Sequence, residues 1–189
     1  MKNIRITLLL FVVLTVLTGL IYPLAMTLIS QTWFPHQSRG SLLTDQTGKV
    51  VGSDLIGQNF SDPKYFWPRP SAVSYNPMPS GGSNLAISGK AFQKAMADRK
   101  EQFLSANPTA KVVPADMLQA SGSGLDPHIS VAAAEAQVDR IAKARHFSAD
   151  QQQKIEDLIK QLKEGRTFNL LGEPRINVLK LNLALNTLK

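Results

Sequence analysis

The chain has 189 residues, enough for one ordinary domain and a short addition. It has no cysteine, which excludes a disulfide framework, a thiolate zinc site, a cysteine nucleophile and a lipid-carrying cysteine. Its 21 Lys and Arg residues exceed its 14 acidic residues and give a formal charge of +7. Because the basic residues form no block, the charge does not indicate a nucleic acid as a partner.

An apolar segment near the N-terminus, Ile6 to Ile29, contains no charged residue. As a helix it would be about 36 Å long, against a hydrocarbon core of roughly 30 Å. The sequence therefore predicts a transmembrane helix over 6–29, a tail over 1–5 and a separate domain over 30–189. Pro23 is expected to weaken or kink this helix, and Gly19 to permit close contact with a neighbouring helix. A cleaved signal peptide is the alternative, but no Ala-x-Ala site follows the segment.

The residues that flank this segment predict its orientation. Lys2 and Arg5 precede it, whereas no charged residue follows it until Arg39. Because short basic flanks stay in the cytoplasm, we expect the N-terminus inside and the bulk of the chain outside. Trp33 and Phe34 follow directly, where interfacial aromatic residues are enriched.

The exported part is expected to be a mixed α/β (α+β) domain with a loop-rich first half over 38–87. Turn-forming residues at 44–48 separate two short apolar pieces, which is typical of a hairpin. The aromatic residues of this half favour an ordered binding surface over disorder. The later predicted elements are a helix from Ser88 to about Ala106, a strand at Val112-Val113, a turn at Ser121–Gly124, helices from Ser130 to about Arg145 and from a Ser148–Gln151 capping box to Gly165, and a strand over Arg175–Val178 followed by a short helix.

Most catalytic signatures are absent from the sequence, and its histidines have no metal-ligand spacing. The run Ser80–Asn84 has two interpretations. Its backbone N–H groups can hold an anion, and it resembles part of the Leu-Ser-Gly-Gly-Gln signature of ABC ATPases. The simpler interpretation, which we favour, is a turn with a glycine at positive φ. A membrane-anchored Ser/Lys hydrolase is a remote alternative, because the Ser-x-Met-x-Pro element of signal peptidases is missing.

Short runs over nearly the whole chain match one known family in order and spacing. They include Gly19 to Pro23, Trp33–Pro35, Leu55–Phe60, Arg69–Ser71, Tyr75–Pro77, Ser80–Leu85, Ala120–Asp126, Ala142–Arg145 and Leu181–Leu185. On these residues the chain resembles the C subunit of the bacterial high-affinity potassium-transporting P-type ATPase, the Kdp complex.

The resemblance implies a non-catalytic subunit of the bacterial inner membrane, with one span and an exported α/β domain, that is needed for assembly and stability of the pump. We expect the span to pack against a channel-like subunit and the domain to lie over the external entrance of that subunit. Its partners would be this potassium-binding A subunit, an ATP-hydrolysing B subunit, a small single-span F subunit and membrane lipid. The residues expected to contact partners are Gly19, Tyr22, Pro23, Trp33, Phe34, Gln58, Asn59, Phe60, Arg69, Tyr75 and Asn76.

The resemblance also implies a catalytic chaperone that raises the ATP affinity of the ATP-hydrolysing subunit, with no tightly bound cofactor of its own. The family attribution associates nucleotide with Ser80, Gly81, Gly82, Ser83 and Asn84. The predicted orientation places this run outside, away from cytoplasmic ATP, so we expect an indirect conformational effect. A free-standing exported binding module tethered by the span is the alternative from another class of function.

Overall fold

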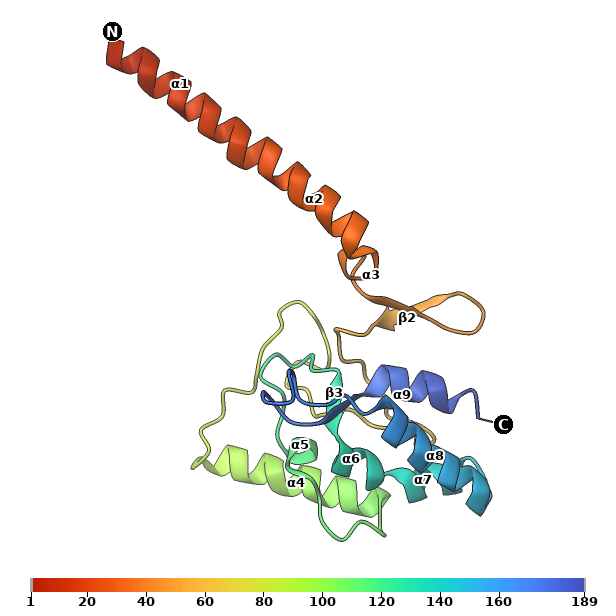
Figure 1. Cartoon of the computed structure of the whole chain (residues 1–189). Coiled ribbons are helices and arrows are strands. Elements are labelled where there is room, and N and C mark those ends of the chain that lie inside the picture. Colours follow the sequence, from red (N-terminus) through yellow and green to blue (C-terminus); the bar gives the residue numbers. More distant parts are fainter. Residues whose placement is uncertain (1, 189) are drawn as a thin grey trace. The chain divides into compact units, whose positions relative to one another are not determined.

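The computed structural model of the protein describes residues 2–188 in two compact units (Figure 1). One unit extends to Leu42, and the other begins at Leu43. The first consists of helix and the second is a mixed helix and small-sheet domain, as the sequence predicts. The two units are described separately below.

The first unit is a helix from Lys2 to Trp33, followed by the short helix α3 (Pro35–Ser38). Within the described residues it is the one helix long and apolar enough to cross a bilayer. It extends beyond the predicted segment at both ends. Hydroxyl groups along it bond back to the preceding turn, as when Thr18 Oγ1 donates to the Leu14 carbonyl at 2.7 Å, which lowers the penalty of a hydroxyl in lipid.

A π-helical turn accommodates Pro23 in this helix. The turn, η1 (Leu17–Ile21), separates α1 (Lys2–Val16) from α2 (Tyr22–Trp33). The Tyr22 N–H donates to the Leu17 carbonyl, five residues back. Proline has no N–H, and its ring clashes with the carbonyl four residues before it, so a wider turn ahead of it relieves the conflict.

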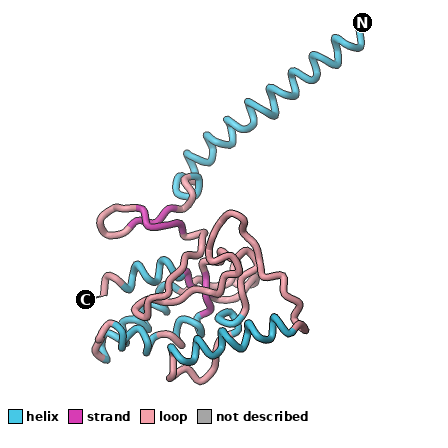
Figure 2. The backbone as a smooth tube through the Cα atoms, turned by 180° about the vertical axis from the view of Figure 1, so that it is seen from behind, coloured by secondary structure: helices cyan, strands magenta, loops and turns pink. Residues whose placement is uncertain are grey.

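The second unit has two small sheets among helices, and residues 54–89 form no strand or helix (Figure 2). Its elements are the paired strands β1 (Leu42–Thr44) and β2 (Val50–Ser53), α4 (Lys90–Ala106), α5 (Ala115–Leu118), β3 (His128–Ser130), α6 (Val131–Glu135), α7 (Val138–Ala144), α8 (Ala149–Leu162), β4 (Arg175–Asn177) and α9 (Val178–Leu185). Strand β3 pairs antiparallel with β4, with Ile129 opposite Ile176. The predicted hairpin, loop-rich half and terminal strand–helix pair are confirmed.

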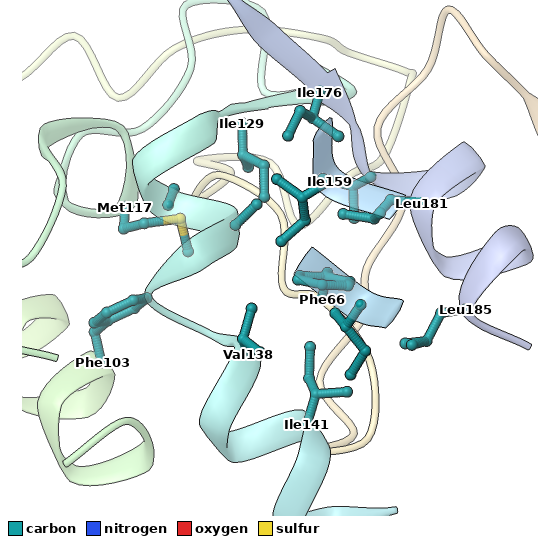
Figure 3. Close-up of a cluster of buried hydrophobic side chains, with 14 residues drawn as sticks. Phe66, Phe103, Met117, Ile129, Val138, Ile141, Ile159, Ile176, Leu181 and Leu185 are labelled. Atoms are coloured by element: carbon teal, nitrogen blue, oxygen red, sulfur yellow. The ribbon is translucent and has the colours of Figure 1, made fainter. Parts of the chain in front are cut away.

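One hydrophobic core unites helices α4 to α9 with strands β3 and β4. Ile129 and Ile176 from the central sheet lie with Ile159 of α8 and Leu181 of α9 (Figure 3). Phe66, from the loop-rich half, is fully buried among them. The loop-rich half is therefore part of the core and is ordered by it.

Two buried side-chain amides attach this half of the domain to the helices. The Phe66 N–H donates to Asn182 Oδ1 at 2.8 Å, and Asn182 Nδ2 donates to the Phe66 carbonyl at 3.0 Å. Gln137 does the same for Trp67, accepting from its N–H at 2.8 Å and donating to its carbonyl at 3.3 Å. These pairs satisfy backbone groups that have no strand partner and would otherwise be costly to bury.

The predicted helix from Ser130 to Arg145 is broken in the structure. Ser130 caps it as expected, accepting from the Ala133 N–H at 3.0 Å, but α6 ends at Glu135. Gln137 Nε2 donates to the Ala133 carbonyl, which the Gln137 N–H would use in a regular helix. The Gln137 N–H donates instead to the Ala134 carbonyl, and a new helix, α7, begins at Val138.

Two other local predictions are wrong. Ser88 does not cap α4, which begins at Lys90 with Gly89 in the N-cap position and no side-chain cap. Val112-Val113 is not a strand: the Val112 side chain is 75% exposed, and Pro114 leads into the short helix α5. By contrast, the capping box at the start of α8 is present as predicted, and that helix ends at Leu162, before Gly165.

The amide of Asn182 gives the first testable prediction. Asn182→Leu removes both hydrogen bonds to buried backbone groups of Phe66, so we expect the free energy of unfolding to fall by about 2–4 kcal/mol. Asn186→Leu, at the exposed position that follows α9, removes only an exposed hydrogen bond from Arg145; it is the matched control and should lower the free energy of unfolding by less than about 1 kcal/mol. Urea unfolding of the detergent-solubilised chain measures both; equal losses would contradict the anchoring role of Asn182.

Candidate functional site

Several of the short runs named above converge in the second unit. The segment Ser121–Asp126 lies at the centre of this cluster. The Gly81 N–H donates to the Ser123 carbonyl at 2.9 Å, Ser71 Oγ donates to the Gly124 carbonyl at 2.7 Å, and the Gly57 N–H donates to the Leu125 carbonyl at 2.7 Å. We call residues 57, 69–75, 80–82 and 121–126 the loop junction.

Glycine is required where these loops approach most closely. Gly124 has a φ of +72°, and a Cβ there would lie 2.4 Å from Val73 Cγ2. Gly82 packs on the backbone of Gly122, with a Cβ position 3.0 Å from its carbonyl oxygen. The expectation of a glycine at positive φ within Ser80–Asn84 is wrong, because in that run the residue at positive φ is Asn84, at 51°. Of the two glycines there, Gly82 serves close packing, whereas a Cβ at Gly81 would meet nothing within 4 Å.

The two glycines of the run Ser80–Asn84 are therefore in contact with the Ser121–Gly124 turn, whereas Ser80, Ser83 and Asn84 are exposed. Its Gly81 N–H already donates to a carbonyl and is not presented to an anion. The run also precedes the first residue of α4 by several positions, so it does not form the N-terminal turn of that helix. The Ser121–Gly124 turn, which the sequence predicts as an isolated feature, is its packing partner.

Arg69 and Asp126 form an ion pair at the edge of the junction. Arg69 Nη1 lies 2.8 Å from Asp126 Oδ2, and the Tyr75 hydroxyl donates to the Arg69 carbonyl at 2.6 Å. Burial acts to raise the pKa of Asp126, but hydrogen bonds from the His128 side chain and backbone and from Arg69 outweigh it and hold the pKa at about 2. Burial raises the pKa of Tyr75 to about 12, so this hydroxyl stays protonated and remains a donor.

A cleft of about 290 Å³ lies beside the junction, and three of the predicted contact residues line it. These are Asn59, Phe60 and Tyr75. The remaining lining residues are Ser61, Trp67, Pro68, Pro70, Ser71, Arg99, Gln102, Phe103 and Met117. The cleft thus combines aromatic and proline side chains with polar ones, the mixture found at both ligand sites and protein interfaces.

Helix α4 contributes cleft residues that the sequence does not single out. Arg99 donates to the Leu118 carbonyl at 2.8 Å and places a positive charge at the cleft, next to the exposed Gln102. From the helical pattern, Arg99 is expected simply to face solvent. No local signal links α4 to the loops 59–61 and 67–75, because the cleft arises from tertiary packing.

The other predicted contact residues lie away from the cleft lining. Gln58 donates to the Val51 carbonyl at 3.0 Å and packs on Gly52. The exposed Asn76 accepts from the Met78 N–H at 3.0 Å. Arg69 is occupied by its ion pair with Asp126.

Five predicted contact residues belong to the first unit. Gly19 lies in the π-helical turn, and a Cβ added there would meet nothing within 4 Å. Tyr22 and Pro23 follow at once, and Tyr22 is 63% exposed. Trp33 and Phe34, at the end of the long helix, are also exposed. These side chains are free to contact a lipid or a neighbouring helix.

No group of three or more His, Asp or Glu side chains among residues 2–188 is arranged to hold a metal ion. His128 lies between two carboxylates, 3.5 Å from Asp126 and 3.6 Å from Glu164. These contacts join the start of β3 to the segment after α8. A structural role accounts for this histidine.

Asp126 gives a prediction on acid stability. Its pKa of about 2 lies below the ordinary 3.8, so its ionised form stabilises the fold above about pH 4, and this contribution is lost as the pH falls toward 2. Asp126→Asn should therefore be less stable than the parent chain at neutral pH, with the difference shrinking between about pH 4 and pH 2. Urea midpoints against pH measure this, with the exposed Asp157→Asn as control. A difference independent of pH would contradict it.

Comparisons with known proteins agree with the resemblance seen in the sequence. The family model described as "K+-transporting ATPase, c chain" matches residues 4–187. The chain is similar to the Potassium-transporting ATPase KdpC subunit of Geobacter sulfurreducens, at 50% identity over 100% of this chain and 99% of that protein. The protein of the same name in Serratia proteamaculans is 50% identical over the full length of both, and that in Methylococcus capsulatus is 49% identical over 96% of both. Family match, identity and coverage together establish that the chain belongs to the C-chain (KdpC) family of potassium-transporting ATPase subunits.

Proposed function

We propose that this chain is a non-catalytic accessory subunit of an ATP-driven potassium pump, anchored by a single span in the bacterial inner membrane. The observation that carries the proposal, together with family membership, is the helix Lys2–Trp33. The apolar segment of this helix is not buried by the rest of the chain. An apolar helix of this length has to be covered by lipid and by other helices.

In this proposal the N-terminus is cytoplasmic and the domain is exported, lying over the external entrance of the channel-like, potassium-binding subunit. Lys2 and Arg5 support this orientation, because short basic flanks remain inside. The ATP-hydrolysing subunit and a small single-span F subunit complete the assembly. The π-helical turn around Gly19 is the proposed helix contact, because a residue without a side chain lets two backbones approach closely.

The cleft beside the loop junction is the proposed docking site for an external loop of the channel-like subunit. Its walls belong to one connected structure: Trp67 is held by Gln137, and Tyr75 by the Arg69 carbonyl. A surface fixed in this way loses little entropy when a partner binds.

The effect on ATP affinity is, in this proposal, indirect. The run Ser80–Asn84 acts as a structural element of the loop junction, because its Gly81 N–H is engaged with Ser123. The subunit changes the ATPase by contacting one conformation of the pump more favourably than another. In this proposal the chain binds no cofactor tightly, and ATP reaches the complex through the ATP-hydrolysing subunit.

Assembly of the complex tests the proposal. Gln102 is exposed at the cleft, so Gln102→Trp fills the cleft while leaving the fold intact. We expect copurification of the other pump subunits to fall by about tenfold, as for a central interface position. Lys100→Trp, at an exposed position outside the cleft lining on the same helix, is the matched control and should copurify normally.

Thermal unfolding of both variants should match the parent chain. Unchanged copurification of Gln102→Trp would contradict docking at the cleft. Survival of the parent chain at full level in cells that lack the other subunits would favour the free-standing tethered module.

A further inference from the structure

The segment between α8 and β4 carries an apolar tip on a narrow hairpin-like stem. Glu164 and Arg175 exchange backbone hydrogen bonds at 2.8 and 3.0 Å, and Thr167 and Leu171 exchange a second pair at 2.9 and 3.0 Å. Arg166 adds an ion pair with Glu173, in which its Nη2 lies 2.9 Å from each carboxylate oxygen. Residues 167–172, which we call the tip loop, are therefore held on a defined support.

The large side chains of the tip loop are directed into solvent. Phe168 is 90% exposed, Leu170 76% and Leu171 60%. Phe168 and Asn169 also have positive φ values of 55° and 58°. A bulky residue in this backbone region is unusual and strained, and a turn of this shape ordinarily has Gly, Asn or Asp there. Phe168 thus combines an unfavourable backbone conformation with an unfavourable exposure of its apolar ring to water.

The distribution of charge separates this tip from an ordinary surface loop. Residues 167–172 contain no charged side chain. The nearest charged residues, Arg166 and Glu173, directly flank this loop and form an ion pair with each other. An apolar, uncharged end with paired charges behind it suits the boundary between lipid headgroups and acyl chains.

The length of the anchor restricts where this tip can act. Residues 34–42 connect the end of the long helix to the second unit. At about 3.3–3.6 Å per residue, this link extends about 30 Å at most. A domain tethered this closely to a bilayer meets lipid at a high effective concentration, so even a weak apolar contact is occupied.

From these observations we propose that the tip loop, through Phe168, Leu170 and Leu171, inserts into the outer face of the lipid bilayer as a second, reversible membrane contact. A lipid surface requires apolar side chains without charge among them, and it requires no complementary pocket. The inference rests on the proposed membrane anchoring. It adds a membrane contact made by the exported domain itself, which limits the freedom of that domain above the membrane.

The test uses the full chain in phosphatidylcholine nanodiscs, alone and within the assembled pump. Because the chain has no cysteine, Asn169→Cys carries an environment-sensitive dye at the tip while all three apolar side chains remain. Ile87→Cys, at another exposed loop position of the same unit, is the control label. We expect brominated lipid to quench the tip label about twofold or more relative to the control label.

Adding Phe168→Asp and Leu170→Asp should abolish this quenching, whereas Val112→Asp, at a 75% exposed position, should not. Quenching equal to the control label, or unaffected by the two aspartates, overturns the inference. A tip label shielded from both lipid and aqueous quenchers in the pump also overturns it, because a protein partner then covers the tip. Copurification of the pump subunits, measured in parallel, separates the two proposals. Normal assembly without quenching of the tip label rejects the lipid contact alone. Failed assembly of the parent chain rejects the proposed function.

Discussion

The fold of the second unit depends on a few buried side-chain amides, which form the hydrogen bonds to backbone groups that a neighbouring strand would otherwise form. Its loop-rich half contributes Phe66 to the centre of the core, yet residues 54–89 contain no strand to pair the backbone there. Gln137, in the break between α6 and α7, and Asn182 of α9 supply the missing hydrogen bonds. Burying Phe66 is favourable because its neighbouring peptide groups are satisfied in this way.

The same anchoring positions the candidate site. The guanidinium carbon of Arg140 lies 4.2 Å from the centroid of the Trp67 ring, and Arg140 Nη2 donates to Gln137 Oε1 at 2.6 Å. Because Gln137 also bonds to the Trp67 backbone, both the ring and the backbone of Trp67 are held in place. Trp67 is in turn one wall of the cleft, and the 69–75 segment of the loop junction begins two residues later at Arg69. A chain of contacts thus connects the core to a surface suited to a protein partner. The role proposed above, to brace or bias a larger complex, requires such a surface more than it requires a reactive group.

The sequence predicts the features that local physics determines. The long apolar helix, the Ser130 cap, the Ser148–Gln151 capping box and the strand–helix pair at the end all depend on neighbouring residues, and all are present. The break in the helix after Glu135 was missed because it depends on the Gln137 side chain competing for a backbone carbonyl. Such competition is decided by tertiary contacts with Trp67 that have no sequence signature.

The candidate site was predictable only in part, for the same reason. The sequence contains two Gly/Ser runs that each look like an isolated turn, and the structure packs them together through Gly81 and Ser123. It also supplies Asn59, Phe60 and Tyr75 as candidate contacts, but the cleft they line is completed by α4. The family resemblance names candidate segments, and only the three-dimensional structure shows which of their side chains are engaged within the domain.

The central claim is that the N-terminus is cytoplasmic and the domain is exported, and cysteine labelling in intact cells tests it most directly. Two single-cysteine variants of the full chain, Asn3→Cys before the span and Val112→Cys in an exposed part of the domain, are treated in intact cells with a maleimide that cannot cross the inner membrane. The account predicts that the label reacts with the cysteine at position 112 in intact cells and with that at position 3 only after the inner membrane is opened. Labelling at position 3 with protection at position 112 would place the domain in the cytoplasm and contradict the account.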